Sequence, residues 1–339
     1  MASGVNGSGL AKRLGRFLPW CLLFVFLVLP EAGVSSNIVR LIFATAVWTT
    51  TSLAWNLLGG MAGQVSFGFA VFYGLGAYAT GLTMHAGGSP YLGFLVGAFI
   101  AVLASLLIGL PTFRLRGPFF AIATIGVTET VRVIMNNLDI TGGASGYRIT
   151  EAGAFRPLEH YYTSITLVAF AVIISTVIAR GKFGLALRAI RQDEDAAASL
   201  GVNPYATKLW VHAIAAALTG IAGGVYARRA AYFYPGDVFA FHTSISIMLM
   251  PVIGGIGTVW GAVLGGVVFG IVQEELVAKF PNVHLLLYGA LLIVIILLEP
   301  DGLLGLLKRL FRKRNSEDPG STNTDEVLWG RGGVEGREL

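Results

Sequence analysis

The sequence predicts an all-α, polytopic membrane protein of about ten transmembrane helices, some short or broken, with cytoplasmic N and C termini. Of its 339 residues, 55% are hydrophobic and only 13% are charged, whereas a soluble domain carries roughly 25% charged residues. The apolar residues also fall into runs of roughly 20, the length that a helix needs to cross a bilayer core. Together these observations exclude a water-exposed surface of ordinary size.

Hydropathy in a window of about 19 residues predicts the positions of the spans. In the first half they are Phe17 to Glu31, Ile38 to Leu58, Ala62 to Met84, Tyr91 to Pro111 and Phe119 to Asn137. In the second half they are Thr163 to Ala179, Ala206 to Tyr226, Phe241 to Ile256, Thr258 to Leu276 and His284 to Pro300. Only the stretch around Gly254, Gly255 and Gly257 separates the eighth span from the ninth.

The first span also has the layout of a signal peptide, because Lys12, Arg13 and Arg16 precede its apolar run. We expect it to be retained in the membrane, and cleavage near Ala32 is the alternative. The single cysteine, Cys21, lies in this stretch. It forms neither an intrachain disulfide nor a multi-cysteine metal site.

The basic residues lie mainly between the apolar runs and orient the helices. One side of the membrane collects Lys12, Arg13, Arg16, Arg114, Arg116, Arg180, Lys182, Arg188, Arg191, Lys208 and the run from Lys308 to Arg314. The other side holds Arg148, Arg156, Arg228, Arg229 and Lys279. Because cytoplasmic loops carry the excess of Lys and Arg, the first side is predicted to be cytoplasmic. The formal charge of +5 then indicates contact with membrane lipid rather than nucleic acid.

Two connections are too long to be simple turns. Residues 138–162 are predicted to be external and to form a small structured cap. Residues 180–204 are predicted to be cytoplasmic and helical, lying on the membrane surface, because alanines follow Asp193, Glu194 and Asp195 and Gly201 supplies a helix stop. Residues 315–339 are rich in Ser, Gly, Asp and Glu and are predicted to be a disordered cytoplasmic tail, which leaves residues 1–314 as a single transmembrane domain.

Glycines in the third span favour a place on a translocation path. Gly63, Gly68, Gly74 and Gly76 let backbones approach closely or break the helix, and broken backbone in a bilayer is tolerated only where protein or a cavity satisfies it. The polar residues Gln64 and Ser66 in the same stretch favour the path. The alternative is ordinary packing of helices through small residues.

Charged residues inside the apolar runs are a second candidate feature. Glu129 and Arg132 share one helix face and are expected to pair; their role is either functional or the fixing of helix packing. Glu274 and Glu275 are interpreted as interfacial, and His212 and His242 lack the spacing of metal ligands.

The exit from the fifth span is polar and rich in turn-forming residues. It contains Asn136, Asn137, Thr141, Gly142 and Gly143. Such a segment is suited to receiving substrate from an external binding protein, and an ordinary loop is the alternative.

The cytoplasmic connection carries a family resemblance. Asp195, Ala196 and Ala197, followed by Gly201, resemble the Glu-Ala-Ala-x-x-x-Gly loop of importer permeases of the ATP-binding-cassette class. In that family the loop docks into the ATPase subunit. Here Asp195 replaces the glutamate, which keeps the charge on a shorter arm.

Further blocks are similar to the LivM-type permeases of high-affinity branched-chain amino acid uptake. They are Gly63 to Gly68 with Tyr73, Gly74, Gly76, Ala77 and Tyr78; Leu115 to Gly117 with Phe119 to Ile122, Glu129, Arg132, Asn137, Thr141 to Gly143 and Gly146; Arg188 to Arg191; and Gly254 to Thr258 with Trp260 and Gly261. Their common order along the chain makes the resemblance specific, since any one block alone is weak.

From the residues and the resemblance together we expect two groups of site residues. The ATPase-coupling group is Arg188, Arg191, Asp195, Ala196, Ala197 and Gly201. The group on the translocation path or near substrate is Gly63, Gln64, Ser66, Gly68, Tyr78, Thr124, Glu129, Asn137, Thr141, Gly142 and Gly143.

The resemblance also implies partners and a location. It implies a second, LivH-type permease subunit, two cytoplasmic ATP-binding-cassette ATPases and an external or periplasmic substrate-binding protein, in a bacterial inner membrane. Branched-chain amino acids are the implied substrates, while urea, short amides and other small solutes stay open, as does the choice between a homodimer and a heterodimer. No cofactor, metal or catalytic residue is expected.

The absence of several sequence motifs also favours a permease without catalytic activity of its own. The chain has no Gly-x-x-x-x-Gly-Lys-Ser/Thr loop, so ATP would be bound by a partner. It has no Gly-x-Ser-x-Gly elbow, His-Glu-x-x-His or paired-cysteine motif either, so a membrane enzyme lacks a candidate site. A stand-alone secondary transporter or channel, using Glu129 and broken helices, remains the principal alternative.

Overall fold

The computed structural model describes residues 36–149, 157–279, 283, 286, 289–290 and 302–306. The predicted first span and the predicted tail lie outside these residues, as does nearly all of the span predicted at His284 to Pro300. The first half contains α2 (Ser36–Trp55), the π-helix η2 (Asn56–Met61), α3 (Phe69–His85), α4 (Pro90–Thr112), α5 (Pro118–Asn136), the 3-10 helices η3 (Asp139–Thr141) and η4 (Gly143–Ser145), and β1 (Tyr147–Arg148). The second half contains α6 (Pro157–Arg180), α7 (Lys182–Gln192), α8 (Glu194–Ser199), α9 (Pro204–Ala230), β2 (Tyr232–Phe233), α10 (Pro235–Val238), α11 (Phe241–Gly254) and α12 (Val259–Lys279).

The helices confirm the all-α, polytopic fold class. Within the described part of the chain, 6 helical stretches are long and apolar enough to cross a membrane. Two more predicted spans correspond to α3, which has 17 residues, and to α12, whose apolar part is Val259–Glu274. All eight spans predicted between Ile38 and Leu276 therefore have a helix in place, and the total of ten stays a prediction.

Two predicted helix starts were wrong. The third span was expected from Ala62, but residues 62–68 are not helical and α3 begins at Phe69. The sixth was expected from Thr163, but α6 begins at Pro157, so the predicted external connection ends earlier than residue 162. Proline is favoured in the first helical turn, where its missing N–H costs nothing, and a hydropathy window does not register that signal.

The split between the eighth and ninth spans is confirmed. Helix α11 ends at Gly254 and α12 begins at Val259. Gly255 and Gly257 between them have φ angles of 132° and 81°, which an L side chain rarely adopts.

Glycines bring α3, α4 and α9 into backbone contact. A Cβ atom added at Gly76 of α3 would lie 1.9 Å from the carbonyl oxygen of Gly220 in α9, and one at Gly223 would lie 1.9 Å from that of Tyr73. A Cβ at Gly97 of α4 would lie 3.0 Å from the carbonyl oxygen of Gly76. Small residues at helix interfaces are the usual means of such close packing in membranes, so Gly76 acts through packing.

We expect Gly76→Ala to destabilise the protein because α3 and α9 would have to separate. Overpacking of this kind costs about 1–3 kcal/mol, which thermal unfolding of the purified protein in detergent measures. Gly126→Ala in α5 is the matched control, since a Cβ there meets no atom within 4 Å and alanine is the better helix former by about 1 kcal/mol. Equal stability of the two variants would contradict the packing argument.

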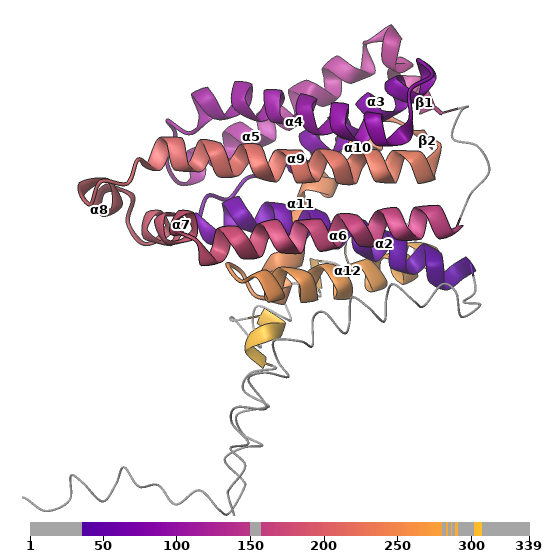
Figure 1. Ribbon diagram of the computed structural model, residues 1–339. Helices are drawn as coiled ribbons and strands as arrows, with labels where there is room; N and C mark the ends of the chain where they lie inside the picture. Colours follow the sequence, from indigo (N-terminus) through magenta and orange to yellow (C-terminus); the bar gives the residue numbers. More distant parts are fainter. Residues whose placement is uncertain are drawn as a thin grey trace, which may run out of the picture.

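The two ends of the helix bundle differ in structure. Helices α7 and α8 project at one end, and the antiparallel pair β1–β2 lies at the other (Figure 1). In the pair, Tyr147 lies opposite Phe233 and Arg148 opposite Tyr232. Together with η3 and η4 this pair makes the structured cap expected within residues 138–162, as far as residue 149. The pairing with residues 232–233 was not predicted, because strands of two residues leave no alternation to detect.

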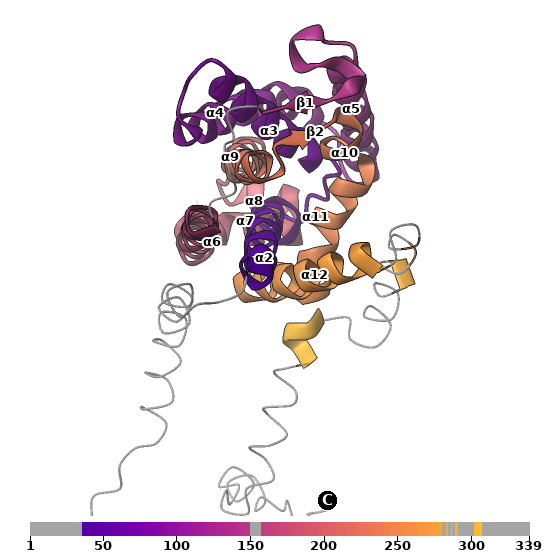
Figure 2. The ribbon, with the colours of Figure 1, turned by 90° about the vertical axis from the view of Figure 1, so that its right-hand side faces the viewer.

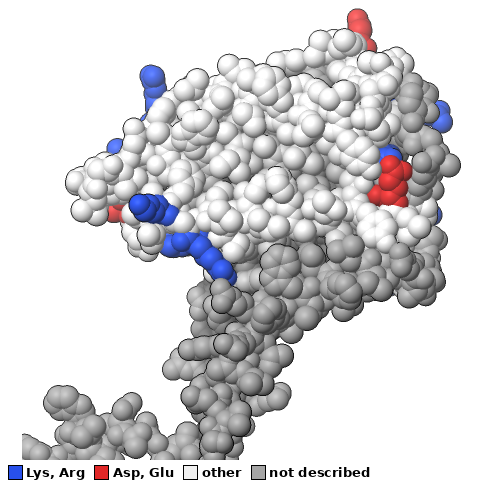
Figure 3. Space-filling model, in the orientation of Figure 1, with Lys and Arg blue, Asp and Glu red and all other residues white. Residues whose placement is uncertain are grey.

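Charged side chains are also concentrated at the two ends of the helix bundle. On the face drawn in Figure 3 they gather near the two ends, and the surface between them is nearly free of charge. Arg116 pairs with Asp195 at the α7–α8 end, and Arg228 pairs with Glu159 at the β1–β2 end. This arrangement suits a helix bundle whose middle lies in hydrocarbon.

Candidate functional site

The first component of the site is the unwound segment, residues 62–68, between η2 and α3. Its backbone is bound by side chains of neighbouring helices. Trp55 Nε1 donates to the carbonyl oxygen of Ser66 at 2.8 Å, the Phe67 N–H donates to Thr124 Oγ1 at 3.0 Å, and Thr128 Oγ1 donates to the carbonyl oxygen of Phe67 at 3.0 Å. Backbone without internal hydrogen bonds is tolerated at membrane depth only with such partners. These contacts therefore stabilise the non-helical conformation of the segment.

The predicted glycine-rich residues form this segment. Gly63 has a φ of 73° and is exposed, and the Gln64 N–H donates to the carbonyl oxygen of Leu58 at 3.3 Å. Ser66 is buried, and its Oγ accepts from the Gly68 N–H at 3.1 Å. These residues thus form a helix break, one of the two roles open to the glycines, and their place on a translocation path stays a prediction.

The second component is the connection between α11 and α12, which is joined to η2 by Asn56. The Asn56 side chain is fully buried. Its Oδ1 accepts from the Gly257 N–H at 2.8 Å, and its Nδ2 donates to the carbonyl oxygen of Thr258 at 3.1 Å. Asn56 was not predicted as a site residue, although an amide inside the apolar run Ile38 to Leu58 is the kind of polar residue that marks function in a membrane span.

The third component is Arg191, which reaches both irregular connections from α7. Its Nη1 donates to the carbonyl oxygen of Gly60 at 2.7 Å. A Cβ at Gly63 would lie 2.9 Å from Arg191 Cγ, and a Cβ at Gly257 would lie 2.4 Å from Arg191 Nη1. We call Arg191, Gly60, Gly63 and Gly257 the Arg191 junction. The side chain of Arg191 thus lies against both irregular connections, with its Cγ near Gly63 and its guanidinium near Gly257.

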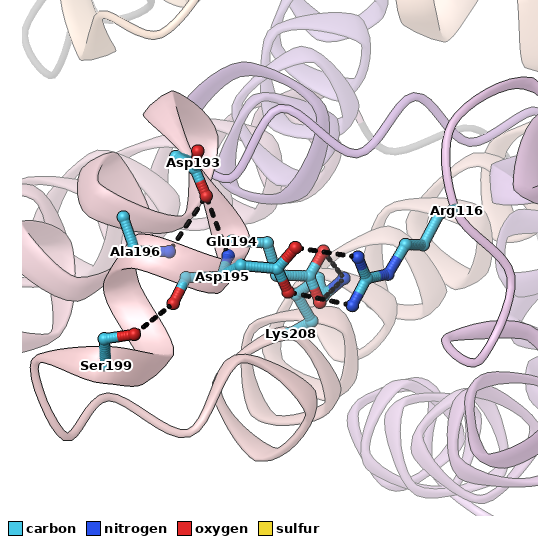
Figure 4. Close-up of polar contacts among 7 residues, drawn as sticks. All are labelled: Arg116, Asp193, Glu194, Asp195, Ala196, Ser199 and Lys208. Atoms are coloured by element: carbon cyan, nitrogen blue, oxygen red, sulfur yellow. Dashed lines mark hydrogen bonds and ion pairs between the residues drawn. The ribbon is translucent and has the colours of Figure 1, made fainter.

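The fourth component is the coupling segment, residues 180–204, which contains α7 and α8. Asp193 caps α8, because its Oδ1 accepts from the N–H groups of Asp195 and Ala196, each at 2.9 Å (Figure 4). At the other end Gly201 has a φ of 86°, and Val202 donates back to the carbonyl oxygen of Ala197 at 3.1 Å. This is a Schellman stop, so the predicted termination at Gly201 is confirmed.

Ion pairs attach α8 to the bundle. Lys208 of α9 is buried, with 1% of its side chain exposed, and its Nζ lies 2.9 Å from Glu194 (Figure 4). Arg116 forms two hydrogen bonds of 3.0 Å with the Asp195 carboxylate, and these bonds raise the pKa of Arg116 above its ordinary value. The exposed Arg116 pair contributes little to stability, whereas the buried lysine requires its partner.

This difference predicts an asymmetry between two substitutions. Glu194→Gln leaves Lys208 buried without a counter-charge and is expected to cost about 3 kcal/mol, whereas Lys208→Met leaves Glu194, which is 29% exposed, within reach of water and should cost less. Thermal unfolding in detergent of both variants and of the double variant measures the difference. A larger loss for Lys208→Met would refute this assignment.

The outer surface of α8 is accessible. Asp195, Ala196 and Ser199 are exposed, and Leu200 at the C-cap is 84% exposed. Arg188, by contrast, donates from Nη1 to the carbonyl oxygen of Ala179 at the end of α6, at 3.0 Å. Within the described residues, nothing buries the outer side of α8 or the Leu200 side chain.

Of the predicted path residues outside the unwound segment, Thr124 bonds to that segment, whereas Tyr78 and Glu129 make other contacts. Tyr78 is buried among Phe233 and Phe239, with ring centroids at 5.0 and 5.8 Å. Arg132 and Glu129 pair on an exposed face of α5, as expected, with Nε to Oε2 at 2.9 Å.

The polar exit of α5 folds back on its own backbone. Asn137 Nδ2 donates to the carbonyl oxygen of Val133 at 2.8 Å, and Thr141 Oγ1 donates to that of Met135 at 3.1 Å. Gly142 and Gly143 have positive φ angles that shape the turn. Through these contacts Asn137 and Thr141 stabilise the turn after α5. That the turn receives substrate from a binding protein stays a prediction.

Comparison with known proteins adds independent information. Residues 37–296 match the family model described as branched-chain amino acid transport system / permease component. The chain is 28% identical to the high-affinity branched-chain amino acid transport system permease protein LivM of Escherichia coli, over 93% of this chain and 80% of the relative. It is 24% identical to the corresponding LivH protein of Salmonella typhimurium, over 77% and 92%. It is also 25% identical to the nucleoside ABC transporter permease protein NupC of Lactococcus lactis, over 69% and 81%. No solved structure matches.

Proposed function

Since the chain belongs to the family of permease components of branched-chain amino acid transport systems, we propose that it forms half of the membrane pathway of an ATP-driven importer. The other half is a second permease subunit of the kind that its LivH relative represents. A permease of this family transports solute and is not an enzyme, so the partners supply ATP hydrolysis. The importer lies in the bacterial inner membrane, that is, the cell membrane.

The proposal rests mainly on the series of contacts that joins the coupling segment to the two irregular connections between helices. Helix α8 presents Leu200 and Asp195 outward, and Arg191 at the end of α7 holds the carbonyl oxygen of Gly60. An ATPase bound to α8 would therefore act, through a short rigid helix, on both irregular connections. Such action shifts the conformational equilibrium only if the ATPase binds α8 differently in its two nucleotide states.

This assignment orients the molecule. The end that carries α7 and α8 faces the cytoplasm, both chain termini lie on that side, and the β1–β2 end faces outward toward a substrate-binding protein. The distribution of basic residues supports this orientation by the positive-inside rule. The remaining two predicted spans bring the total to ten.

Branched-chain amino acids are the proposed substrates. The names of the LivM and LivH relatives support them, while the nucleoside permease among the relatives indicates that the same family serves other solutes. L-Leucine and uridine are therefore the two substrates to compare.

Reconstitution tests the proposal. The purified complex of this permease, its partner permease, both ATPases and the binding protein should take up labelled L-leucine in proteoliposomes only when ATP is supplied to the ATPase side. Leucine uptake by this chain alone, driven by an ion gradient without ATP, would establish the secondary-transporter alternative instead. ATP-dependent uptake of uridine but not leucine would overturn the proposed substrate and keep the transport class.

A further inference from the structure

A cavity lies in the half of the molecule that carries β1 and β2. Its volume is about 170 Å³, it is partly open to the outside, and residues of α2, α3, α9, α10, α11 and α12 line it. Figure 2 looks onto this end of the bundle, where α2, α9, α10, α11 and α12 surround the region. A cavity of roughly 150 Å³ accommodates benzene, so this space, with its opening, suits a molecule the size of a single amino acid.

Three charged side chains line the cavity, and all three are half-buried. They are Arg229, Asp237 and Glu274. The Arg229 guanidinium lies 5.1 Å from the ring centroid of Phe43, and Asp237 Oδ2 accepts from the Tyr226 hydroxyl at 3.4 Å. Among the described residues, neither Arg229 nor the two carboxylates form an ion pair. Charges in a membrane domain are costly without a counter-charge, so a positive and a negative group held apart at one cavity require an explanation.

A neutral polar group at the same cavity is also unsatisfied. Gln273 lines the cavity next to Glu274, and its Oε1 is buried without a hydrogen-bond partner among the described residues. An unmet buried acceptor costs about 1–3 kcal/mol. A ligand that carries a hydrogen-bond donor would remove this cost.

Another part of the wall is apolar, while Tyr73, Tyr226, His242, Thr243 and Ser246 add further polar groups. Phe43, Ala44, Val47 and Trp48 of α2 and Val238 of α10 line the cavity. The cavity therefore combines a cationic group, anionic groups, an unpartnered acceptor and an aliphatic and aromatic surface. A free aliphatic amino acid has the complementary parts: a carboxylate, an ammonium group and a branched hydrocarbon side chain.

We propose that this cavity is a binding site within the permease for a free α-amino acid with an aliphatic side chain. Arg229 binds the α-carboxylate, Asp237 and Glu274 bind the α-ammonium group with Gln273 as a further acceptor, and the α2 residues contact the side chain. The site rests on the proposed function and sharpens it, because a nucleoside has neither the carboxylate nor the ammonium group and would not suit this wall.

Direct binding to the purified complex, without binding protein or ATP, tests the site. L-Leucine is titrated into the wild-type complex and into complexes with Arg229→Gln or Asp237→Asn. Each substitution removes a charge-assisted hydrogen bond and should raise the Kd roughly tenfold to a hundredfold. Arg148→Gln and Asp139→Asn are the matched controls, because both residues are exposed and neither lines the cavity.

Analogues assign each contact. Leucinamide lacks the carboxylate, so Arg229→Gln should weaken leucine binding while leaving leucinamide binding nearly unchanged. The deaminated acid 4-methylpentanoate lacks the ammonium group, so Asp237→Asn should leave its binding unchanged. Val47→Phe narrows the apolar wall without touching a charge and should also weaken leucine binding, which keeps the test decisive if a charge variant fails to assemble.

Unchanged leucine binding in Arg229→Gln, Asp237→Asn and Val47→Phe would overturn the site, as would the absence of leucine binding to the wild-type complex. These results leave the proposed function standing if the wild-type complex still shows ATP-dependent leucine uptake in proteoliposomes. Loss of that uptake in the wild type contradicts the proposed function itself, so the two failures are distinguishable.

Discussion

Removal of residues 195–201 is expected to abolish substrate-stimulated ATP hydrolysis while membrane insertion and assembly of the bundle continue. The deletion removes the exposed part of α8, with Ala196, Ser199 and Leu200, which we propose as the ATPase contact. It also removes the exposed Arg116–Asp195 pair, whose loss costs little. Glu194 and its buried partner Lys208 remain, and insertion depends on the apolar helices.

The readout is the ATPase rate of the reconstituted complex with and without substrate-loaded binding protein. Deletion of an equally long segment within residues 315–339 is the control for chain shortening. Leu200→Asp is the milder variant, and it should weaken co-purification of the ATPase roughly tenfold or more, because a buried leucine contributes about 1.5–3 kcal/mol. Normal substrate stimulation in the deletion variant would remove α8 from the coupling mechanism.

Substitution of Arg191 is expected to uncouple transport from ATP hydrolysis. Arg191→Met keeps much of the side-chain length but loses the hydrogen bond to the carbonyl oxygen of Gly60. Bonds to a charged group contribute roughly 1.5–3 kcal/mol, so the amount of leucine transported per ATP should fall about tenfold or more. Binding of the ATPases and basal ATP hydrolysis should persist, since the docking surface of α8 is intact.

The ratio of transport to hydrolysis reports transmission, and thermal unfolding of the same variant measures its loss of stability separately. Arg191→Lys keeps a positive donor and should restore part of the ratio. Gly257→Ala provides an independent test, because its Cβ would lie 2.4 Å from Arg191 Nη1 at a φ of 81°. Arg180→Met, at an exposed basic residue of the same end, is the control. A wild-type ratio in Arg191→Met would disprove transmission through the Arg191 junction.

Local signals predicted much of this fold. Runs of apolar residues located eight helices, Gly63 and Gly68 indicated that a helix break was one possibility, and Gly201 predicted the end of α8. Each of these depends on residues near in sequence. To predict the helix start at Pro157, one would have to use the preference of proline for the first helical turn. An average of hydropathy over a window does not contain that information.

Long-range contacts were beyond sequence reasoning. Asn56 bonds to residues more than 200 positions away, and no periodicity encodes that pairing. Arg191 was placed in the ATPase-coupling group because Arg188 to Arg191 resembles a block of the family, and its bond to the carbonyl oxygen of Gly60 was not predicted. Glu274 was interpreted as interfacial, since a polar residue near the end of an apolar run has the same pattern whether it faces headgroups or a cavity.

The glycine contacts described for α3 and α9 have a mechanical consequence. Backbones this close cannot slide past each other, so α3, α4 and α9 form one rigid block. Helices α2, α11 and α12 form another, in which added Cβ atoms at Gly266 and Gly254 would lie 2.5 Å from Thr49 Cα and 1.9 Å from the carbonyl oxygen of Gly261. The chain passes from α2 to α3 through residues 62–68, so we expect the unwound segment to act as a hinge. The arginine that contacts Gly63 thus lies where a small rotation of one block against the other would begin.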